Sequence, residues 1–377
     1  MKARNELCAV CRNHVFLIAA ILFLSPLTVL AQMGYHIDNK VTVTNFTGQI
    51  DHLLILVGYP ETNQYQTVCN INQNDWTLHD LENSESKYCR FDFGSEYFTG
   101  TRHGAAATLS YDVILNEVHF DFDAVDEIKS YDKQSEIYRN YTGERGEYVI
   151  PSHPRVQHLA DSLWNQSTDI IDYARNCYNY IGKSYRYLDA MTGLHTLQQI
   201  FDDGGGDCGN LSSIFICLMR NKCIPARHVQ AYRPNGSFHV WSEFYLEGYG
   251  WVPVDVTMPV QGFKGNYFGN YTDNCIVVQT DVNHTYLLDA ESYQTFAYPL
   301  LQSYIWWWWG DENSNPTIKH QVTSRRVDLT PVVSPSADTT SLSSDLPMFD
   351  LSGQQTTSRR GLRIVQGSDG TKHKVLF

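Results

Sequence analysis

The stretch 206–255 places a cysteine, a histidine and an aspartate in the order and local settings that thiol chemistry requires. Cys208 follows three glycines (204–206) and Asp207, and it precedes an apolar run typical of a helix. The free N–H groups and the dipole at a helix N-terminus favour thiolate over thiol. The sequence therefore predicts a nucleophilic cysteine at a helix N-terminus, beside N–H groups that are placed to hold an oxyanion.

A histidine and an aspartate follow on a predicted hairpin. The segment FHVWSEFYLEGYGWVPVDVT reads as two strands joined by a turn at 247–250, with His239 on the first strand and Asp255 on the second. Side chains alternate faces along a strand, so a loop of even length would put the two on opposite faces. We therefore predict an odd-length turn or a bulge between Ser242 and Val252. Asp255 would then orient one imidazole nitrogen and leave the other to face the sulfur.

These residues lie in motifs that resemble the transglutaminase-like superfamily, a branch of the papain-like cysteine enzymes. The motifs are GDCGN, CIPARHVQAY, HVWSEFYL and GWVPVDVTM, in the family's order and with ordinary spacing. The chain departs from the family pattern at four positions. Cys223 and Ala231 stand where the family often has glycine. Val240 stands where it often has alanine, and Val256 where it often has proline. None of the departures removes a catalytic group.

The resemblance implies a role for each residue of the triad. Cys208 would be the nucleophile, His239 the general base and acid, and Asp255 the orienting carboxylate. It extends upstream to helices expected at 154–166 and 168–186, and it covers about residues 150–300.

The remaining site candidates are less constrained. A second oxyanion donor is not identified by the sequence, but Gln198, Gln199 and Tyr187 precede the cysteine and carry suitable donors. Trp241 and Glu243 share the strand parity of His239. They could therefore line the site, while core packing for Trp241 and a salt bridge for Glu243 are equally open.

No metal or cofactor is predicted. The chain beyond residue 31 has no CxxC pair or histidine cluster with zinc-ligand spacing. Asp203 and Asp207 flank the glycines and have chemistry suited to a metal or an amine, although a solvated acidic loop is the preferred interpretation.

The N-terminus has the pattern of an export signal. Residues 1–31 combine Lys2, Arg4 and Arg12 with an apolar run and small residues at the expected cleavage positions, so a signal peptide is predicted, with a retained signal anchor as the alternative. After cleavage we expect a periplasmic, cell-surface or extracellular protein without stable membrane insertion. The formal charge of −13 disfavours a nucleic-acid partner.

The cysteine count predicts one free thiol in an exported chain. Of nine cysteines, seven follow the predicted signal, and an odd number leaves one free thiol, for which Cys208 supplies a reason. Cys69 and Cys89 could form a disulfide in an oxidising compartment. Buried thiols are expected at three helix-associated positions: Cys177, Cys217 and Cys223.

The predicted fold class is α+β. An antiparallel β-sandwich with its connector (35–150) would precede a papain-like, transglutaminase-like core (151–310), in which helices pack on an antiparallel sheet. A Ser/Thr/Pro-rich linker (311–345) and a short β module (346–377) would follow. The module resembles small C-terminal modules of exported Bacteroidetes proteins, some of which are sorting signals for type IX secretion; a mere terminal hairpin is the alternative.

Four successive tryptophans, Trp306–Trp309, close the predicted core. On a strand, two indoles would face each side. One pair could then be exposed and stack on a sugar ring or a partner, but burial between domains is the preferred interpretation.

Three functions are compatible with this sequence. The first is thiol-dependent acyl transfer or hydrolysis at amide bonds of a protein or peptide, through a thioester, with an amine or water as acceptor. The second is a catalytically silent module that binds envelope proteins or glycans. The third is a structural envelope protein whose cysteine is a redox or attachment point. The substrate and the oligomeric state do not follow from the sequence.

Overall fold

The computed structural model describes residues 32–329, apart from gaps at 74, 101–102, 190–192, 290–293, 303 and 312, and the strands 348–349, 362–366 and 372–376. The predicted signal peptide at 1–31 lies outside the described residues. Within the described part of the chain, no helix is long and apolar enough to span a bilayer.

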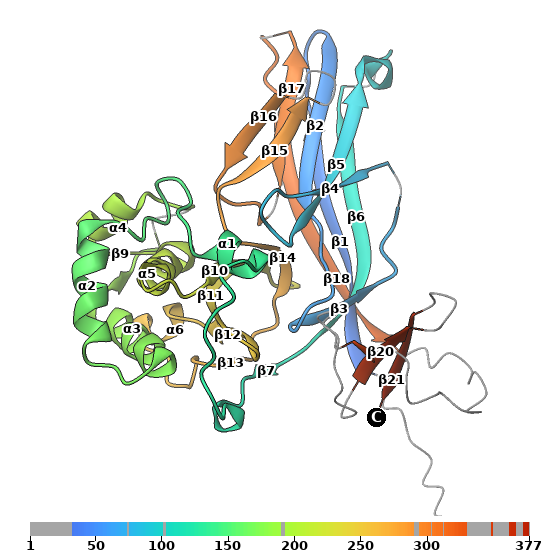
Figure 1. The fold of residues 1–377 in the computed structure, drawn as a ribbon. Helices are drawn as coiled ribbons and strands as arrows, with labels where there is room; N and C mark the ends of the chain where they lie inside the picture. The colour runs from blue at the N-terminus through green and yellow to red at the C-terminus, as the bar shows by residue number, and fades with distance from the viewer. Residues whose placement is uncertain are drawn as a thin grey trace, which may run out of the picture.

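Two four-stranded antiparallel sheets form a β-sandwich, on the right in Figure 1. The first has the order β18-β1-β6-β3 and the second the order β17-β2-β5-β4. Their bounds are β1 Gln32–Thr44, β2 Ile50–Gly58, β3 Gln66–Cys69, β4 Thr77–Asp80, β5 Lys87–Gly94, β6 Ala105–Leu115, β17 Ile305–Gly310 and β18 Thr317–Leu329. Alternate residues of both sheets meet in a core that includes Ile37, Leu53 and Leu109.

Two strands of the sandwich, β17 and β18, come from the C-terminal end of the range 32–329. β18 pairs with β1 along its whole length, from Gln32 opposite Leu329 to Thr44 opposite Thr317. The prediction of a linker at 311–345 is therefore wrong for 317–329, and β17 belongs to the sandwich although it lies inside the range predicted for the catalytic core. β18 is an edge strand with one face in solvent, so few apolar residues suffice to hold it.

The four tryptophans lie on β17 and alternate faces as expected. Trp306 and Trp308 pack against the core between the two sheets. Trp307 is 48% exposed, whereas Trp309 stacks on His52 with ring centroids 4.7 Å apart. The preferred interpretation, burial of the tryptophans between domains, is therefore wrong for Trp307.

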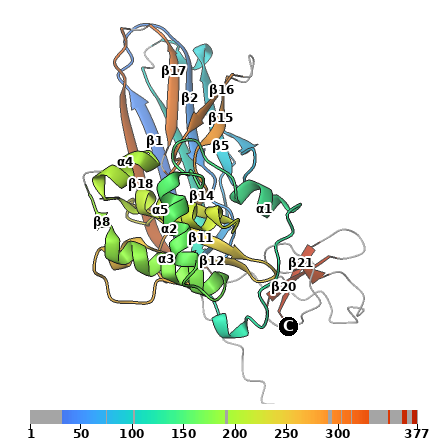
Figure 2. The ribbon, with the colours of Figure 1, turned by 60° about the vertical axis from the view of Figure 1, so that its left-hand side comes forward.

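The second part of the molecule is a sheet covered on one face by helices. The sheet has the order β12-β11-β10-β14, with bounds β10 Ala226–Tyr232, β11 Phe238–Leu246, β12 Gly250–Val254 and β14 Ile276–Thr280. Helices α2 (Pro154–Trp164), α3 (Ile170–Ser184) and α5 (Cys208–Asn221) gather on its outer side in Figure 2. α5 is almost wholly buried and contacts β10 and β11. The predicted α+β fold class is confirmed.

The observed helices lie close to the predicted ranges. α2 and α3 fall inside 154–166 and 168–186, and α5 begins at the predicted nucleophile. Asp169 caps α3 by accepting the N–H of Asp172 at 2.8 Å. The predicted lead-in of helices before Cys208 is thus present.

Smaller elements complete the described chain. They are α1 Glu136–Tyr141, α4 Leu197–Asp203, α6 Thr257–Val260, β7 Val118–His119, β8 Arg186–Tyr187, β9 Gly205–Gly206, β13 Asn270–Tyr271, and the hairpin β15 His284–Asp289 with β16 Gln294–Tyr298. At the C-terminus β19 Met348–Phe349, β20 Leu362–Gln366 and β21 Lys372–Leu376 form one antiparallel sheet, where short strands were expected.

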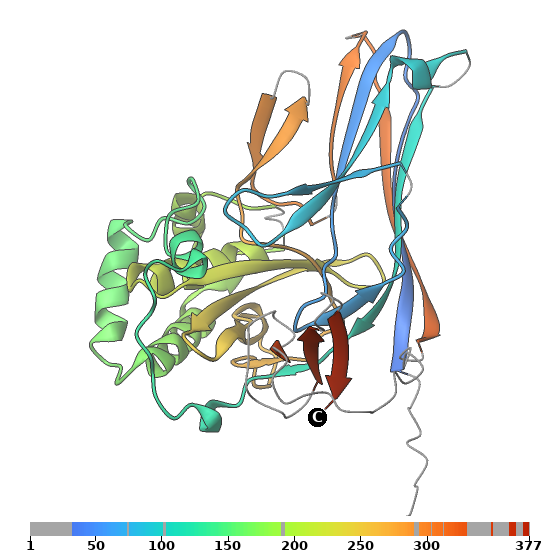
Figure 3. The same ribbon diagram turned by 45° about the vertical axis from the view of Figure 1, so that its right-hand side comes forward.

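The sheet β12-β11-β10-β14, which we call the core sheet, lies between its helices and the sandwich, as Figure 3 shows. Buried hydrogen bonds join the two parts: Gln66 Nε2 donates to the Val277 carbonyl at 2.8 Å, and the Thr280 N–H donates to Ser86 Oγ at 2.8 Å. The hydroxyls of Tyr111 and Tyr232 also form a hydrogen bond with each other. The sandwich is therefore packed on the face of the sheet that the helices leave open.

Two cysteine predictions are corrected. Cys89 is a free, buried thiol on β5, while Cys69 lies on β3 of the opposite sheet, so the bridge between them is not formed. Cys177 and Cys217 are buried as predicted, but Cys223 is exposed. Cys223 has φ 56°, a conformation that favours glycine, which is the residue that the family often has there.

A buried ion pair ties α5 to β14 and to the connector before α2. Asp281 accepts from Arg220 Nη2 at 2.8 Å and from Arg145 Nε at 2.6 Å. Asp281 and Arg220 are both fully buried. Burial raises the pKa of the Asp281 carboxyl, but Arg220, His228 and Arg145 together hold it well below its usual range.

We predict that Asp281→Ala lowers the free energy of unfolding by about 3–5 kcal/mol, because it leaves the buried Arg220 charge without its partner. Asp161→Ala is the matched control: it removes an exposed carboxylate from Lys222, and should cost about 0–1 kcal/mol. Urea unfolding of both variants measures the difference. Equal losses would contradict the assignment of the Asp281 cluster as a main support of the core.

Candidate active site

Cys208 is the first residue of α5, and the chain before it is held on both sides. Asp207 is the N-cap and accepts the Asn210 N–H at 3.1 Å. Gly205 pairs with Arg186 in the short parallel β8/β9 pair, and a side chain there would come within 2.1 Å of the Arg186 carbonyl oxygen. The glycines thus allow the strand to pass close to β8 just before Cys208.

Asn210 fixes the loop that faces the start of α5. Its Oδ1 accepts the His195 N–H at 2.8 Å, and its Nδ2 donates to the Gly193 carbonyl at 3.1 Å and to Asp207 at 2.8 Å. Asn210 is fully buried. Its role in holding this loop was not predicted; the local signal was the spacing D-x-x-N across a helix start.

His239 and Asp255 meet across the hairpin as predicted. Leu246 pairs with Gly250, so the turn between β11 and β12 has three residues, an odd number. The His239 and Asp255 side chains therefore share a face, and His239 Nε2 lies 2.7 Å from Asp255 Oδ2. The other oxygen of Asp255 accepts the Thr257 N–H at 3.0 Å. Both side chains of the pair are nearly buried, with 7% and 4% exposed.

Cys208 lies close enough to His239 to raise the pKa of that imidazole. Because Nε2 is paired with Asp255, Nδ1 is the nitrogen left for the sulfur. Burial lowers the pKa of His239, but the charge and hydrogen bond of Asp255, followed by Cys208, raise it to about 10. The raised pKa favours the imidazolium form of His239, which is held beside the Asp255 carboxylate and next to Cys208.

Trp241 and Glu243 take the core and salt-bridge positions that were left open. Trp241 is fully buried and stacks on Tyr271, with ring centroids 4.0 Å apart. Its ring centroid lies 6.0 Å from that of His239, and the two ring planes are 27° apart. Its indole N–H donates to the Tyr65 hydroxyl of the β-sandwich at 3.1 Å. Tyr65 in turn donates to Glu243 at 2.6 Å. The sandwich thus contacts the strand that carries His239.

Of the predicted oxyanion candidates, Tyr187 lies near Cys208. It is on β8, half-buried, and its pKa is raised to about 12, first by burial and then by the negative charges of Cys208 and Asp207. Its hydroxyl consequently keeps its proton at neutral pH and remains a hydrogen-bond donor.

The two glutamines have other partners. Gln199 closes a capping box with Thr196 at the start of α4. Gln198 is exposed on the same helix and donates to Asp202 at 2.8 Å. Their assignment as oxyanion candidates is therefore not supported by the structure. The pattern T-x-x-Q was the sequence signal for the cap.

The two aspartates of the glycine loop differ from each other. Asp203 is exposed, as the solvated-loop interpretation expects. Asp207 instead caps α5, and burial raises the pKa of its carboxyl. The expectation of a solvated Asp207 was wrong, because its carboxylate is used by the first turn of the helix.

Comparison with known proteins confirms the resemblance over the core. Residues 157–256 match the family model of the Transglutaminase-like superfamily, a range that contains Cys208, His239 and Asp255. A search of curated proteins gives no match.

Solved structures share the fold at low sequence identity. A crystal structure of a candidate cysteine protease from Cytophaga hutchinsonii superposes with a TM-score of 0.52 and 15% identity, covering 79% of this chain and 93% of that one. The periplasmic domain of TgpA from Pseudomonas aeruginosa, bound to ethylmercury, gives a TM-score of 0.33 and 12% identity, covering 61% and 91%. The first of these extends the similarity beyond the core and shows a common fold.

We predict that Asp255→Asn lowers the pKa of His239 from about 10, since the carboxylate that favours the imidazolium is lost while burial still disfavours it. NMR of isotope-labelled histidine, followed across the neutral and alkaline range, measures the shift. Asp273→Asn is the control, because Asp273 has its own partner, Arg233, and should move the titration less. An unchanged His239 pKa in Asp255→Asn would contradict the assigned pairing.

Proposed function

We propose that this chain is an exported thiol enzyme that cleaves or transfers the acyl group of a protein or peptide amide. The observation that carries the proposal is the arrangement of Cys208, His239 and Asp255. The thiol lies at a helix start and within reach of an imidazole, whose other nitrogen is 2.7 Å from a buried carboxylate. This is the arrangement by which a base activates a thiol nucleophile.

In the proposed reaction the Cys208 thiolate attacks the amide carbonyl carbon and forms a tetrahedral oxyanion. The carbon–nitrogen bond then breaks, and the His239 imidazolium gives its proton to the leaving amine. A thioester remains on Cys208. His239, now neutral, removes a proton from an incoming amine or water, which attacks the thioester and releases the sulfur as thiolate. Asp255 keeps the imidazole oriented in both steps.

The proposed oxyanion donors are the backbone N–H of Cys208 and the hydroxyl of Tyr187. The first belongs to the turn of α5 in which N–H groups lack intrahelical acceptors. The second comes from β8, which is fixed to the glycine strand by the bond from the Arg186 N–H to the Gly204 carbonyl at 3.1 Å. Both donors are thus on elements joined directly to the nucleophile, which limits their movement during the reaction.

We predict that wild-type protein, incubated with a glutamine-containing protein and a labelled primary amine, modifies the substrate and that Cys208→Ala and His239→Ala do not. Incorporated label identifies transfer to an amine. A mass increase of about 1 Da, or chain cleavage, identifies transfer to water. Mass spectrometry distinguishes these results, and Cys223→Ala, which removes an exposed cysteine outside the triad, is the control. If no substrate changes, the proposal fails and a silent binding module is favoured.

We predict that Tyr187→Phe lowers kcat by about 100-fold with little change in KM, the typical cost of removing one oxyanion donor. Tyr180→Phe in α3, a half-buried tyrosine packed on the same core, is the matched control and should retain activity. Steady-state kinetics on the best substrate from the previous experiment provides the comparison. A KM effect alone would assign Tyr187 to substrate binding instead.

A further inference from the structure

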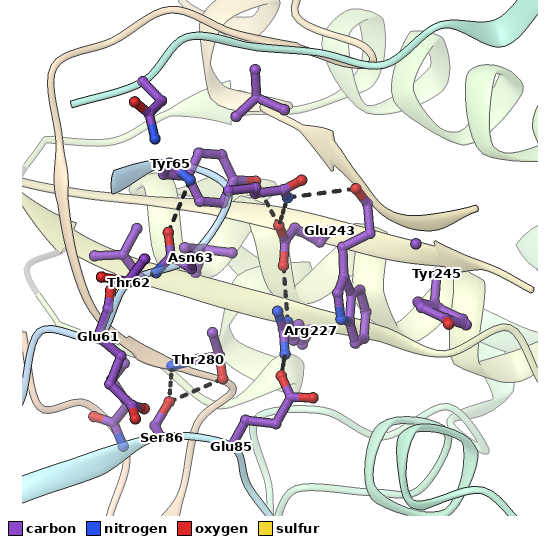
Figure 4. Close-up of a pocket in the computed structure, with 18 of the residues that line it drawn as sticks. Glu61, Thr62, Asn63, Tyr65, Glu85, Ser86, Arg227, Glu243, Tyr245 and Thr280 are labelled. Atoms are coloured by element: carbon purple, nitrogen blue, oxygen red, sulfur yellow. Dashed lines mark hydrogen bonds and ion pairs between the residues drawn. The ribbon is translucent and has the colours of Figure 1, made fainter. Parts of the chain in front are cut away.

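A cavity of about 710 Å³ lies between the β-sandwich and the core sheet (Figure 4). None of Cys208, His239 and Asp255 lines it. Its walls come from the loop between β2 and β3, from the two residues just before β5, and from β10, β11, β12 and β14. Both parts of the molecule therefore build this cavity, which we call the seam pocket.

The charges around the seam pocket are mainly negative. Glu61, Glu85 and Glu243 line it, and Arg227 is the one lining arginine among the described residues. Arg227 is already paired, with its Nε 2.8 Å from Glu243 and its Nη1 2.6 Å from Glu85, as Figure 4 shows. Arg227 therefore neutralises only part of the negative charge.

Glu61 is partly exposed and has a cation of its own. Lys87 contacts it at 3.1 Å and contacts Asp80 at 4.0 Å. Burial raises the pKa of Glu61, Lys87 lowers it, and the charges of Glu85 and Asp80 raise it again. With Asp80, Lys87 and Lys129 included, four carboxylates lie beside three cations, so the wall keeps a net negative charge that would stabilise a further positive charge.

Aromatic rings form much of the remaining wall, and two of them already hold cations. The pocket is lined by Tyr59, Tyr65, Tyr245, Tyr249 and Trp251. The Arg227 guanidinium lies 3.9 Å from the Trp251 ring centroid, and Lys129 Nζ lies 5.6 Å from that of Tyr249. Carboxylates beside aromatic faces are the chemistry that recognises ammonium and guanidinium groups.

A buried amide adds an acceptor to the same wall. Gln279 lines the seam pocket, is 1% exposed, and its side-chain oxygen has no hydrogen-bond partner within the described chain. A buried carbonyl of this kind gains free energy when a donor reaches it. The chemistry of the wall thus favours a ligand that carries both a positive charge and N–H donors.

We propose that the seam pocket is a second binding site, for a lysine or arginine side chain of a peptide or protein. Where the bound peptide is also the substrate, the inference rests on the proposed function. Binding of a basic side chain in the pocket does not depend on that function. Tyr65 connects the two sites, since it lines the pocket and accepts the N–H of Trp241, which lies next to His239. A basic residue bound in the pocket contacts the wall that supports the catalytic strand.

The test is calorimetric titration of the full chain carrying Cys208→Ala, so that binding is measured without turnover. The probes are the capped tripeptides Gly-Lys-Gly, Gly-Arg-Gly and Gly-Gln-Gly. At least one basic peptide should bind more tightly than the glutamine peptide, and added salt should weaken that binding. Comparison of the lysine and arginine peptides identifies the preferred group.

The double substitution Glu61→Gln and Glu85→Gln should weaken binding of the basic peptide about fivefold, to the level of the glutamine peptide. The side chains of Glu61 and Glu85 are partly exposed, at 33% and 58%, so the double variant should fold. Thermal unfolding checks this. If the double variant does not fold, Glu61→Gln alone replaces it. Glu96→Gln, an exposed position on the sandwich, is the matched control. Equal binding of all three peptides, no binding, or an effect of Glu96→Gln as large as that of the pocket variant would overturn the proposal.

Discussion

The candidate site depends on the 2.7 Å contact between His239 and Asp255. The two side chains share a face only because the turn between β11 and β12 has an odd number of residues. One oxygen of the carboxylate is occupied by the backbone of Thr257, which leaves the other for the imidazole. Asp255 therefore sets the orientation of His239 and its protonation together, and both are needed for a thiol to act as nucleophile and for an amine to leave.

The β-sandwich is part of this arrangement. Its Tyr65 accepts from Trp241 and donates to Glu243 on the same face of β11 that carries His239. The backbone carbonyl of His239 also accepts from Gln302, which lies just before β17. The strand that carries His239 is thus supported from the sandwich side, and the seam pocket lies at the same interface.

Much of the site could be predicted because its constraints are local. A helix start fixed the place of Cys208, and side-chain alternation along two adjacent strands required the odd turn. Partners that come from distant parts of the chain could not be predicted in this way. Tyr65 and Trp241 are far apart in sequence, and the pairing of β18 with β1 joins the two ends of the described sandwich. The segment of β18 has the composition of a linker because an edge strand with one solvated face needs few apolar residues. The roles of Gln199 and Asp207 show that helix capping uses polar side chains which composition alone assigns to catalysis or to solvent.

The most direct test of the central claim is detection of the acyl-enzyme. Wild-type protein is mixed with a peptide that carries an activated acyl group, and the reaction is quenched in acid. Mass spectrometry then measures the intact protein and its proteolytic fragments. We expect one acyl group attached to Cys208 as a thioester that an added amine or water removes, and no such adduct in His239→Ala at the same time points. Acylation at another cysteine, or equal acylation of the His239 variant, would contradict a nucleophile activated by the His239–Asp255 pair.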